Sequence, residues 1–124
     1  MPATAPDSVE RVDYGPIEVG TVELDGYTSD FLHIKQPIDM HLMLQGLPDD
    51  RCPCPHWGIV TEGRMTVTYA DHEEVVSAGD VFYMAPGHVP EYQPGTRIIQ
   101  FSPTDQLQVV TEAIMRNQQH LQPS

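Results

Sequence analysis

Short apolar runs separated by turn residues constrain the fold of this chain more than any other feature. Asp25-Gly26 is a strong signal for a tight hairpin, and Gly63 and Gly79 mark further turns. Twelve prolines and nine glycines in 124 residues agree with many short strands in one small domain. The pattern predicts an all-β meander or jelly roll, with strands near residues 17–24, 27–34, 38–45, 56–61, 64–70, 74–77, 81–84 and 96–101.

A single helix is predicted after the last strand. Ser102-Pro103-Thr104-Asp105 offers an N-cap serine, a proline at the first helical position and an early aspartate. The apolar residues Leu107, Val110, Ile114 and Leu121 follow on one helical face, which we expect to pack on the outside of a barrel. The helix should end near residue 118 or 119. The predicted organisation is a flexible segment at 1–14, a barrel at 15–102, and a helix with its tail at 103–124.

The charge of the chain excludes several classes of partner. Eighteen acidic and six basic residues give a formal net charge of −12, which repels nucleic acids and anionic membranes. An anionic substrate would need a metal or a local arginine, such as Arg64 or Arg97, to offset this charge. The first residues lack the basic and apolar parts of a signal peptide, and no window is apolar enough to span a membrane. We therefore expect a cytoplasmic protein with reduced cysteines.

Two segments carry the residues that suggest chemistry. Residues 52–63 are Cys-Pro-Cys-Pro-His-Trp-Gly-Ile-Val-Thr-Glu-Gly, and residues 79–90 are Gly-Asp-Val-Phe-Tyr-Met-Ala-Pro-Gly-His-Val-Pro. Together they resemble the two motifs of the cupin family, over roughly residues 38 to 102. The resemblance implies a cupin-type double-stranded β-helix, a jelly-roll barrel with a metal inside it. Cupins commonly use a His-x-His pair and a glutamate from the first motif, and a last histidine from the second.

The first motif fits the family pattern in two registers. Counting back from Gly63 puts His56 at the glutamate position, Cys52 at the second histidine position and Asp50 at the first. In a shifted register, Cys54 and His56 instead replace the His-x-His pair. The sequence leaves both registers open.

The second motif has Pro90 at the usual histidine position, and the nearest imidazole is His88, two residues earlier and on the same face of an extended chain. The resemblance implies that His56 and His88 face each other inside the barrel from adjacent strands.

Strand geometry limits which thiol can join His56. Side chains at i and i+2 lie roughly 6.6 Å apart on one face, so Cys54 and His56 can reach one ion. Cys52 lies roughly 13 Å from His56 in a regular strand, and could join only if the two prolines bend the chain. Thiolate and imidazole suit transition metals better than magnesium or calcium. We expect one divalent ion, zinc, iron, nickel, copper or manganese, with ligands drawn from His56, His88, Cys54 and Cys52.

Other polar residues are assigned smaller roles. Glu91, Tyr83 and Tyr92 are candidate catalytic proton carriers near the mouth of the barrel. His41 is an auxiliary ligand or pocket residue in the strand expected at 38–45. His72, in a hairpin turn, and His120, in the tail, should both be solvated.

Side chains alternate between the two faces of the strand expected at 56–61, which separates inward from outward residues. If His56 faces inward, Gly58 and Val60 share its face and Gly58 leaves space above the metal. Trp57 and Ile59 then face outward, where they would be poor surface residues on a monomer. We expect a homodimer through these residues, or else coverage of them by the N-terminal strands.

The sequence supports three hypotheses about function. The first is a metal-dependent enzyme of oxygenase, isomerase or lyase type that acts on a small organic molecule. The alternative is a non-catalytic cupin that binds or senses a small ligand, and the third is a dimerising scaffold. The chain has no Gly-rich phosphate loop and no G-x-S-x-G elbow, so neither nucleotide chemistry nor serine hydrolysis is supported.

Overall fold

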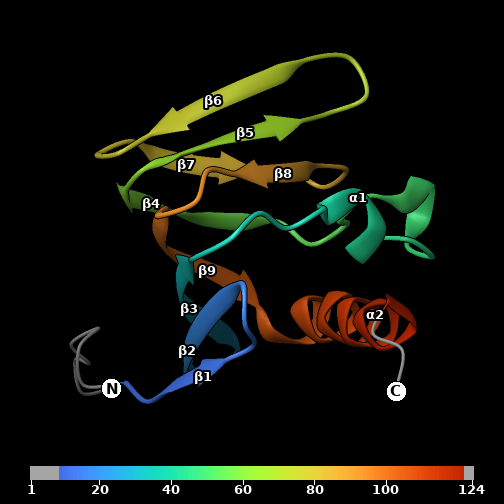
Figure 1. Ribbon diagram of the computed structural model, residues 1–124, viewed down its shortest axis with the longest axis horizontal. Coiled ribbons are helices and arrows are strands. Elements are labelled where there is room, and N and C mark those ends of the chain that lie inside the picture. Colours follow the sequence, from blue (N-terminus) through green and yellow to red (C-terminus); the bar gives the residue numbers. More distant parts are fainter. Residues whose placement is uncertain (1–8, 122–124) are drawn as a thin grey trace.

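The strands of this protein form two antiparallel sheets. The computed structural model describes residues 9–121, and only the backbone of residues 120 and 121. One sheet has the strand order β1-β2-β3-β9-β4-β7 and the other β6-β5-β8 (Figure 1). The strands are β1 (Arg11–Asp13), β2 (Ile17–Leu24), β3 (Tyr27–Ile34), β4 (His56–Glu62), β5 (Arg64–Thr68), β6 (Glu73–Ser77), β7 (Val81–Met84), β8 (Val89–Tyr92) and β9 (Arg97–Pro103).

Turn chemistry fixes the register of the first long hairpin as expected. Asp25 and Gly26 adopt φ values of 50° and 88°, the left-handed pair that a two-residue hairpin turn requires. Leu24 is therefore paired with Tyr27 at the end of β2 and β3. The all-β jelly-roll architecture with a C-terminal helix is confirmed.

Two apolar clusters hold the elements together. The first lies inside the barrel and contains eight buried residues: Leu32, Val60, Met65, Val67, Val76, Phe82, Met84 and Ile98. The second lies against the C-terminal helix α2 (Thr104–Leu121), and it contains Leu44, Leu47, Cys52, Cys54, Val89, Val110 and Ala113. Both cysteines are thus buried beside the helix rather than exposed in a loop.

The strand expected at 38–45 is wrong, because these residues form the short helix α1 (Met40–Met43). The Asp39 side chain accepts hydrogen bonds from the backbone amides of His41 and Leu42, at 3.0 and 3.3 Å. This cap stabilises a helical turn despite the alternating apolar pattern. A 3₁₀ helix, η2 (Pro48–Asp50), follows it.

The C-terminal helix is present but begins later than predicted. Strand β9 continues through Ser102 and Pro103, so Ser102 is not the N-cap, and α2 runs from Thr104 to Leu121. The Thr104 amide donates to the Gly26 carbonyl at 3.0 Å, which anchors the start of the helix to the first hairpin. The side chains of His120, which was expected to be solvated, and of Leu121 lie outside the described residues.

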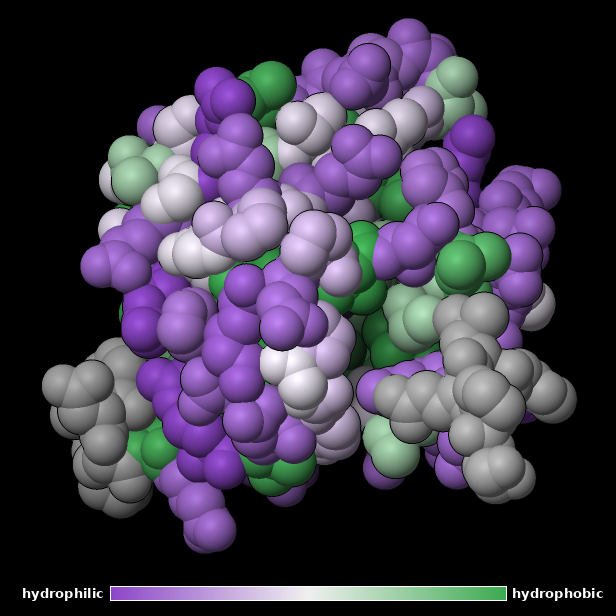
Figure 2. Space-filling model, viewed as in Figure 1, coloured by the Kyte–Doolittle hydropathy of each residue, from purple (hydrophilic) through white to green (hydrophobic). Residues whose placement is uncertain are grey.

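Two short strands were not expected from the sequence. β1 extends the large sheet within the segment predicted to be flexible, where Arg11 pairs with Gly20, and residues 1–8 lie outside the description. β8 pairs with β5 immediately after His88. In the part of the chain that is described, no helix has the length and apolarity to cross a membrane. Hydrophilic residues predominate on the face drawn in Figure 2.

Candidate metal centre

Three buried side chains from different segments converge at one end of the barrel. Their ligand atoms, the Cys52 Sγ and one ring nitrogen each of His56 and His88, all lie within 4.8 Å of one another. His56 is the first residue of β4, Cys52 precedes that strand, and His88 lies in the connection between β7 and β8. The Cys52 amide donates to the His88 carbonyl at 3.0 Å, which ties the two motifs together. We call these three residues the triad.

The segment before β4 bends, and this brings Cys52 to His56. The Cys52 Sγ lies 3.6 Å from the His56 Nε2, far closer than a regular strand would allow. The triad therefore corresponds to the register counted back from Gly63. Asp50, which falls at the first histidine position in that register, is exposed, and its Oδ1 accepts from the Gly46 amide at 2.9 Å.

The two histidines approach each other as predicted, with ring centroids 5.0 Å apart. They do not come from adjacent strands, however, because His88 lies in a connection rather than next to β4. The His88 Nδ1 donates to the Ala85 carbonyl at 2.6 Å. This bond places the proton on Nδ1 and leaves the Nε2 lone pair free to bind a metal.

A chain of hydrogen bonds orients His56 in the same way. Its Nδ1 lies 2.6 Å from the Ser102 Oγ, the Ser102 hydroxyl bonds to the Cys54 thiol, and the Cys54 thiol donates to the Pro55 carbonyl at 3.4 Å. The Pro55 carbonyl can only accept, so the Cys54 thiol uses its proton on that bond and accepts from the Ser102 hydroxyl. The Ser102 oxygen then accepts the proton of the His56 Nδ1. The His56 Nε2 then presents its lone pair beside Cys52.

Cys54 therefore supports the site from outside the triad. It is fully buried, but it does not belong to the group of converging ligand atoms. Sequence reasoning missed Ser102 as a site residue, because its position before a proline suggested a helix cap. Its shared strand face with Ile98 could have placed it inside the barrel.

Burial keeps the triad uncharged in the metal-free protein. Burial and, secondarily, the charge of His88 lower the pKa of His56 to about 3, and burial also lowers the pKa of His88. Burial raises the pKa of Cys52 to about 11. Both imidazoles are thus neutral ligands at neutral pH, while a metal that binds the thiol must displace its proton.

Two of the three predicted proton carriers lie away from the triad. Glu91 and His41 are exposed at the surface, where the Glu91 Oε1 lies 3.8 Å from the His41 Nε2. Tyr83 is also exposed and stacks on Trp57 with ring centroids 5.2 Å apart. Tyr92 packs against the apolar core, and burial, followed by the charge of the nearby Cys52, raises its pKa, so this tyrosine is the one predicted carrier near the triad.

Gly58 does not leave space above the metal site, contrary to the expectation from the sequence. A Cβ at this position would lie against the Ile99 carbonyl, 2.8 Å from the Phe82 ring and 2.9 Å from the Gln100 Cα. Gly58 instead allows β9 and the Phe82 ring to approach β4 closely. The inward direction of Val60 and the outward direction of Trp57 are confirmed, with 0% and 41% exposure.

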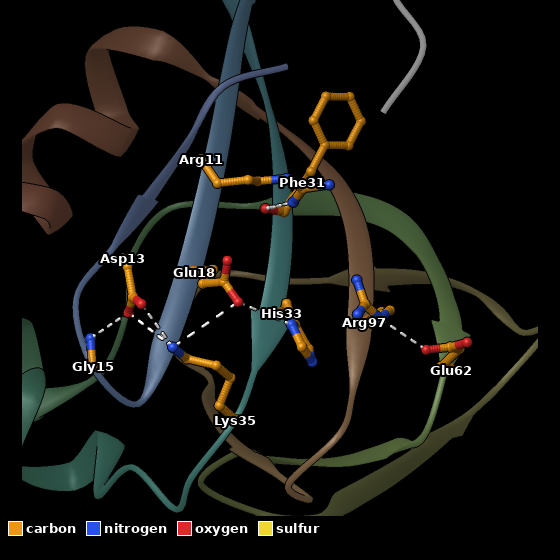
Figure 3. Close-up of polar contacts among 9 residues, drawn as sticks. All are labelled: Arg11, Asp13, Gly15, Glu18, Phe31, His33, Lys35, Glu62 and Arg97. Atoms are coloured by element: carbon orange, nitrogen blue, oxygen red, sulfur yellow. Dashed lines mark hydrogen bonds and ion pairs between the residues drawn. The ribbon is translucent and has the colours of Figure 1, made fainter. Parts of the chain in front are cut away.

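Two open cavities lie on the outside of the barrel. One, of about 300 Å³, is lined by Val9, Arg11, Glu18, His33 and Arg97; the other, of about 340 Å³, includes Val75, Val81 and Tyr83. Neither is lined by a triad residue. Figure 3 shows the ion pairs around the first cavity, including Arg97 Nε with Glu62 Oε2 at 2.8 Å. Arg64 is exposed as well, so neither arginine is buried with the triad.

Removal of the Ser102 hydroxyl should weaken metal binding. We expect Ser102→Ala to lower the affinity for Zn²⁺ by about ten- to hundredfold, because His56 would lose the partner that fixes its tautomer and orientation. Isothermal titration would measure the change, with Ser77→Ala, on β6, as the control that keeps wild-type affinity. Wild-type affinity in Ser102→Ala would contradict this role for the hydroxyl.

Comparisons with known proteins agree with this architecture. The family model of AraC-like ligand binding domains matches residues 43–119. An RmlC-like cupin from Shewanella frigidimarina is 17% identical with a TM-score of 0.55, and the match covers 81% of this chain and 88% of that one. KdgF from Halomonas sp. is 16% identical with a TM-score of 0.55, and the match covers 80% of this chain and 90% of KdgF.

A third solved structure, HppE in its Fe(II) form, is 10% identical with a TM-score of 0.53, and the match covers 82% of this chain and 60% of that one. A comparison with curated proteins finds no match. The structural similarities show the cupin fold.

Proposed function

The chain belongs to the family of AraC-like ligand binding domains and is a small cupin domain; from this premise we propose that it binds a small organic molecule at a transition metal held by Cys52, His56 and His88. The convergence of these three buried ligand atoms within 4.8 Å of one another carries the proposal.

The donor set fits a transition metal. One sulfur and two imidazole nitrogens suit zinc, iron, nickel, copper or manganese better than calcium or magnesium. Each imidazole is held by a hydrogen bond from its Nδ1, to the Ser102 hydroxyl for His56 and to the Ala85 carbonyl for His88. In each ring the Nε2 lone pair is therefore left for a metal. Such outer partners are typical of histidines that ligate metals.

Three protein ligands are typical of sites that take an exogenous ligand. Structural zinc sites usually have four protein ligands, whereas catalytic sites have three and an open position. A bound ion would supply a Lewis acid with a coordination position not taken by the triad. The burial of the triad by the surrounding barrel would limit access of bulk water. These features support a metal-dependent enzyme of oxygenase, isomerase or lyase type.

A specific observation favours the second candidate, a non-catalytic binding or sensor domain. Two of the three candidate proton carriers, Glu91 and Tyr83, are exposed, and Tyr92 packs against the apolar core. Turnover of candidate substrates by metal-loaded protein would distinguish the two functions, since a sensor would bind a ligand without consuming it.

Cobalt substitution tests the metal site and the choice of thiol together. Elemental analysis of untagged protein should give one transition-metal ion per chain, and Co²⁺-loaded protein should show thiolate-to-cobalt charge-transfer absorption. We expect Cys52→Ser to abolish this band and Cys54→Ser to retain it, since only Cys52 belongs to the triad. A band that disappears only in Cys54→Ser would place the ligand at the other thiol. No metal and no band in the wild-type protein would refute the proposed centre.

The outer face of the large sheet supports the expected homodimer. Tyr27, Trp57, Tyr83 and Phe101 form an exposed aromatic row across β3, β9, β4 and β7. The N-terminal strands extend this sheet and leave Trp57 41% exposed.

Sedimentation at micromolar concentration should give twice the 13.9 kDa chain mass, and Trp57→Glu should give a monomer. Val109→Glu, on the exposed side of α2, is the control. A wild-type monomer would contradict the homodimer.

A further inference from the structure

The inward residues of β3, β9 and β4 form three successive levels inside the barrel. Register pairs Leu32 with Ile98, Asp30 with Gln100 and Thr28 with Ser102 between β3 and β9. On the other side of β9, Val60 pairs with Ile98 and Gly58 with Gln100. The first level is apolar core, and the last meets the triad through the bond between Ser102 and His56. The middle level, Asp30 and Gln100 opposite Gly58, lies between them.

The middle level is buried but incompletely paired. Asp30 and Gln100 are only 8% and 6% exposed. The Asp30 carboxyl accepts from the Thr21 hydroxyl at 3.1 Å and from the Gln100 amide, while burial raises its pKa to about 6. Among the described residues, Gln100 Oε1 is the buried side-chain oxygen without a hydrogen-bond partner.

A purely structural polar residue in the same barrel has a different environment. Thr96 is fully buried, and its hydroxyl contacts the Arg64 and Gln93 carbonyls at 3.0 and 2.6 Å and the Arg64 amide at 3.2 Å. Because buried polar groups in native proteins are almost always paired, an orphan such as Gln100 Oε1 implies a donor from outside the chain, either an ordered water or a ligand group that replaces it.

We propose that Asp30 and Gln100 form a binding subsite for a group that carries hydrogen-bond donors and no negative charge, a hydroxyl or an ammonium on a small organic ligand. The subsite offers an unpaired carbonyl acceptor beside a carboxylate. None of the six basic residues is buried, so an anion would meet Asp30 without a compensating charge. The inference rests on the proposed function of the barrel as a small-molecule site and assigns its ligand class.

The subsite lies one level away from the triad along the strands. Gln100 lies two residues before Ser102 on the same face of β9, a separation of roughly 6.6 Å. A ligand bound at the triad by one end could therefore place a donor against Gln100 Oε1.

Three probes that share one carbon skeleton test the ligand class. Full-length protein, metal-free and Zn²⁺-loaded, would be titrated with 1-amino-2-propanol, 1,2-propanediol and lactate, while NMR follows the side-chain amide signals of Gln100. In the metal-free protein we expect saturable shifts with the amine or the diol and much weaker ones with lactate, which has no metal there to bind its carboxylate. Tightest binding of lactate by the metal-free protein, or no shift of the Gln100 amide with any probe in either form, would overturn the proposal.

Matched variants separate a binding pair from a structural one. Gln100→Met keeps the length of the side chain and should weaken the amine or diol by about tenfold or more, the cost of one lost hydrogen bond. Gln108→Met, at an exposed position of α2, should leave binding unchanged. The double variant Asp30→Leu, Gln100→Met replaces both partners by apolar groups and should melt at or above the wild-type temperature without probe. A double variant that melts well below wild type would assign the pair a structural role and overturn the proposal.

The metal proposal and the subsite proposal fail in different ways. Gln100→Met should bind Zn²⁺ with wild-type affinity, because Gln100 is outside the triad. Probe binding at Gln100 in a protein that takes up no metal would refute the metal centre and support the subsite. Metal uptake without any response of the Gln100 amide would do the reverse.

Discussion

Replacing His56 with alanine is expected to abolish the stabilisation that a transition metal gives this protein. Ligands fixed on the folded barrel bind only the native state, so metal at a hundredfold excess over its Kd should stabilise the wild-type protein by about 2.7 kcal/mol. His56→Ala removes one of the three triad ligands and also leaves the Ser102 hydroxyl without its imidazole partner. Thermal melts with and without Zn²⁺, Fe²⁺, Mn²⁺, Ni²⁺ or Cu²⁺ measure the difference.

His72→Ala is the matched control for this experiment. His72 is half exposed, and its nitrogens contact the Asp71 and Glu74 carboxylates at 2.7 and 3.2 Å in the β5–β6 hairpin. Loss of the His72 side chain should leave the stabilisation by metal unchanged. If His56→Ala still gains as much stability from metal as the wild type, the triad is not the binding site.

Gly58→Ala, which adds one methyl group in the middle of β4, is expected to destabilise the protein strongly. The new Cβ would meet the Ile99 carbonyl, the Gln100 Cα at 2.9 Å and the Phe82 ring at 2.8 Å. Two of these neighbours are backbone atoms of β9, so the strands must separate for the methyl to fit. We expect a loss of about 3 kcal/mol in the free energy of unfolding, the upper part of the range for overpacked cores, measured by urea denaturation.

Gly20→Ala separates this steric cost from the general effect of alanine in a strand. A Cβ at Gly20 would meet only side-chain atoms, of Val9 at 3.0 Å and Arg11 at 3.2 Å, and both side chains can shift. Its cost should be about 1 kcal/mol or less. An equal loss in the two variants would show that the close approach of β9 to Gly58 does not determine the stability of β4.

The register of the metal motif shows how far spacing alone can predict a site. Counting back from Gly63 brings Cys52 and His56 into one group, whereas strand periodicity favoured Cys54. The bend before β4 brings Cys52 rather than Cys54 to His56, with the Cys52 Sγ 3.6 Å from the His56 Nε2. Periodicity could not predict this result, because it assumes a regular strand and residues 52–55 do not form one.

The two elements mispredicted near the site differ in how far away the deciding contact lies. Alternating apolar residues favoured a strand at 38–45, but the Asp39 cap makes α1 helical there. Ser102 resembled a helix cap, but β9 continues through it and its hydroxyl bonds to His56. The first error concerns a local cap, whose partners are two and three residues away. The second concerns a partner 46 positions away, which spacing alone cannot identify.

The sequence by itself determined the fold class, the hairpin at Asp25-Gly26, the C-terminal helix and the approach of His56 to His88. The first three follow from local turn chemistry and periodicity, which depend on residues close together in the chain, and the last follows from the resemblance of the two motifs to the cupin family. Only the tertiary structure decided which thiol joins the histidines, that Ser102 orients His56, and that Gln100 Oε1 is buried without a partner. The choice of thiol depends on the bend before β4 and on the bridge between Cys52 and His88. The other two features depend on β3, β4 and β9 lying side by side, and contacts between residues 46 positions apart or more leave no periodic signal in a single sequence.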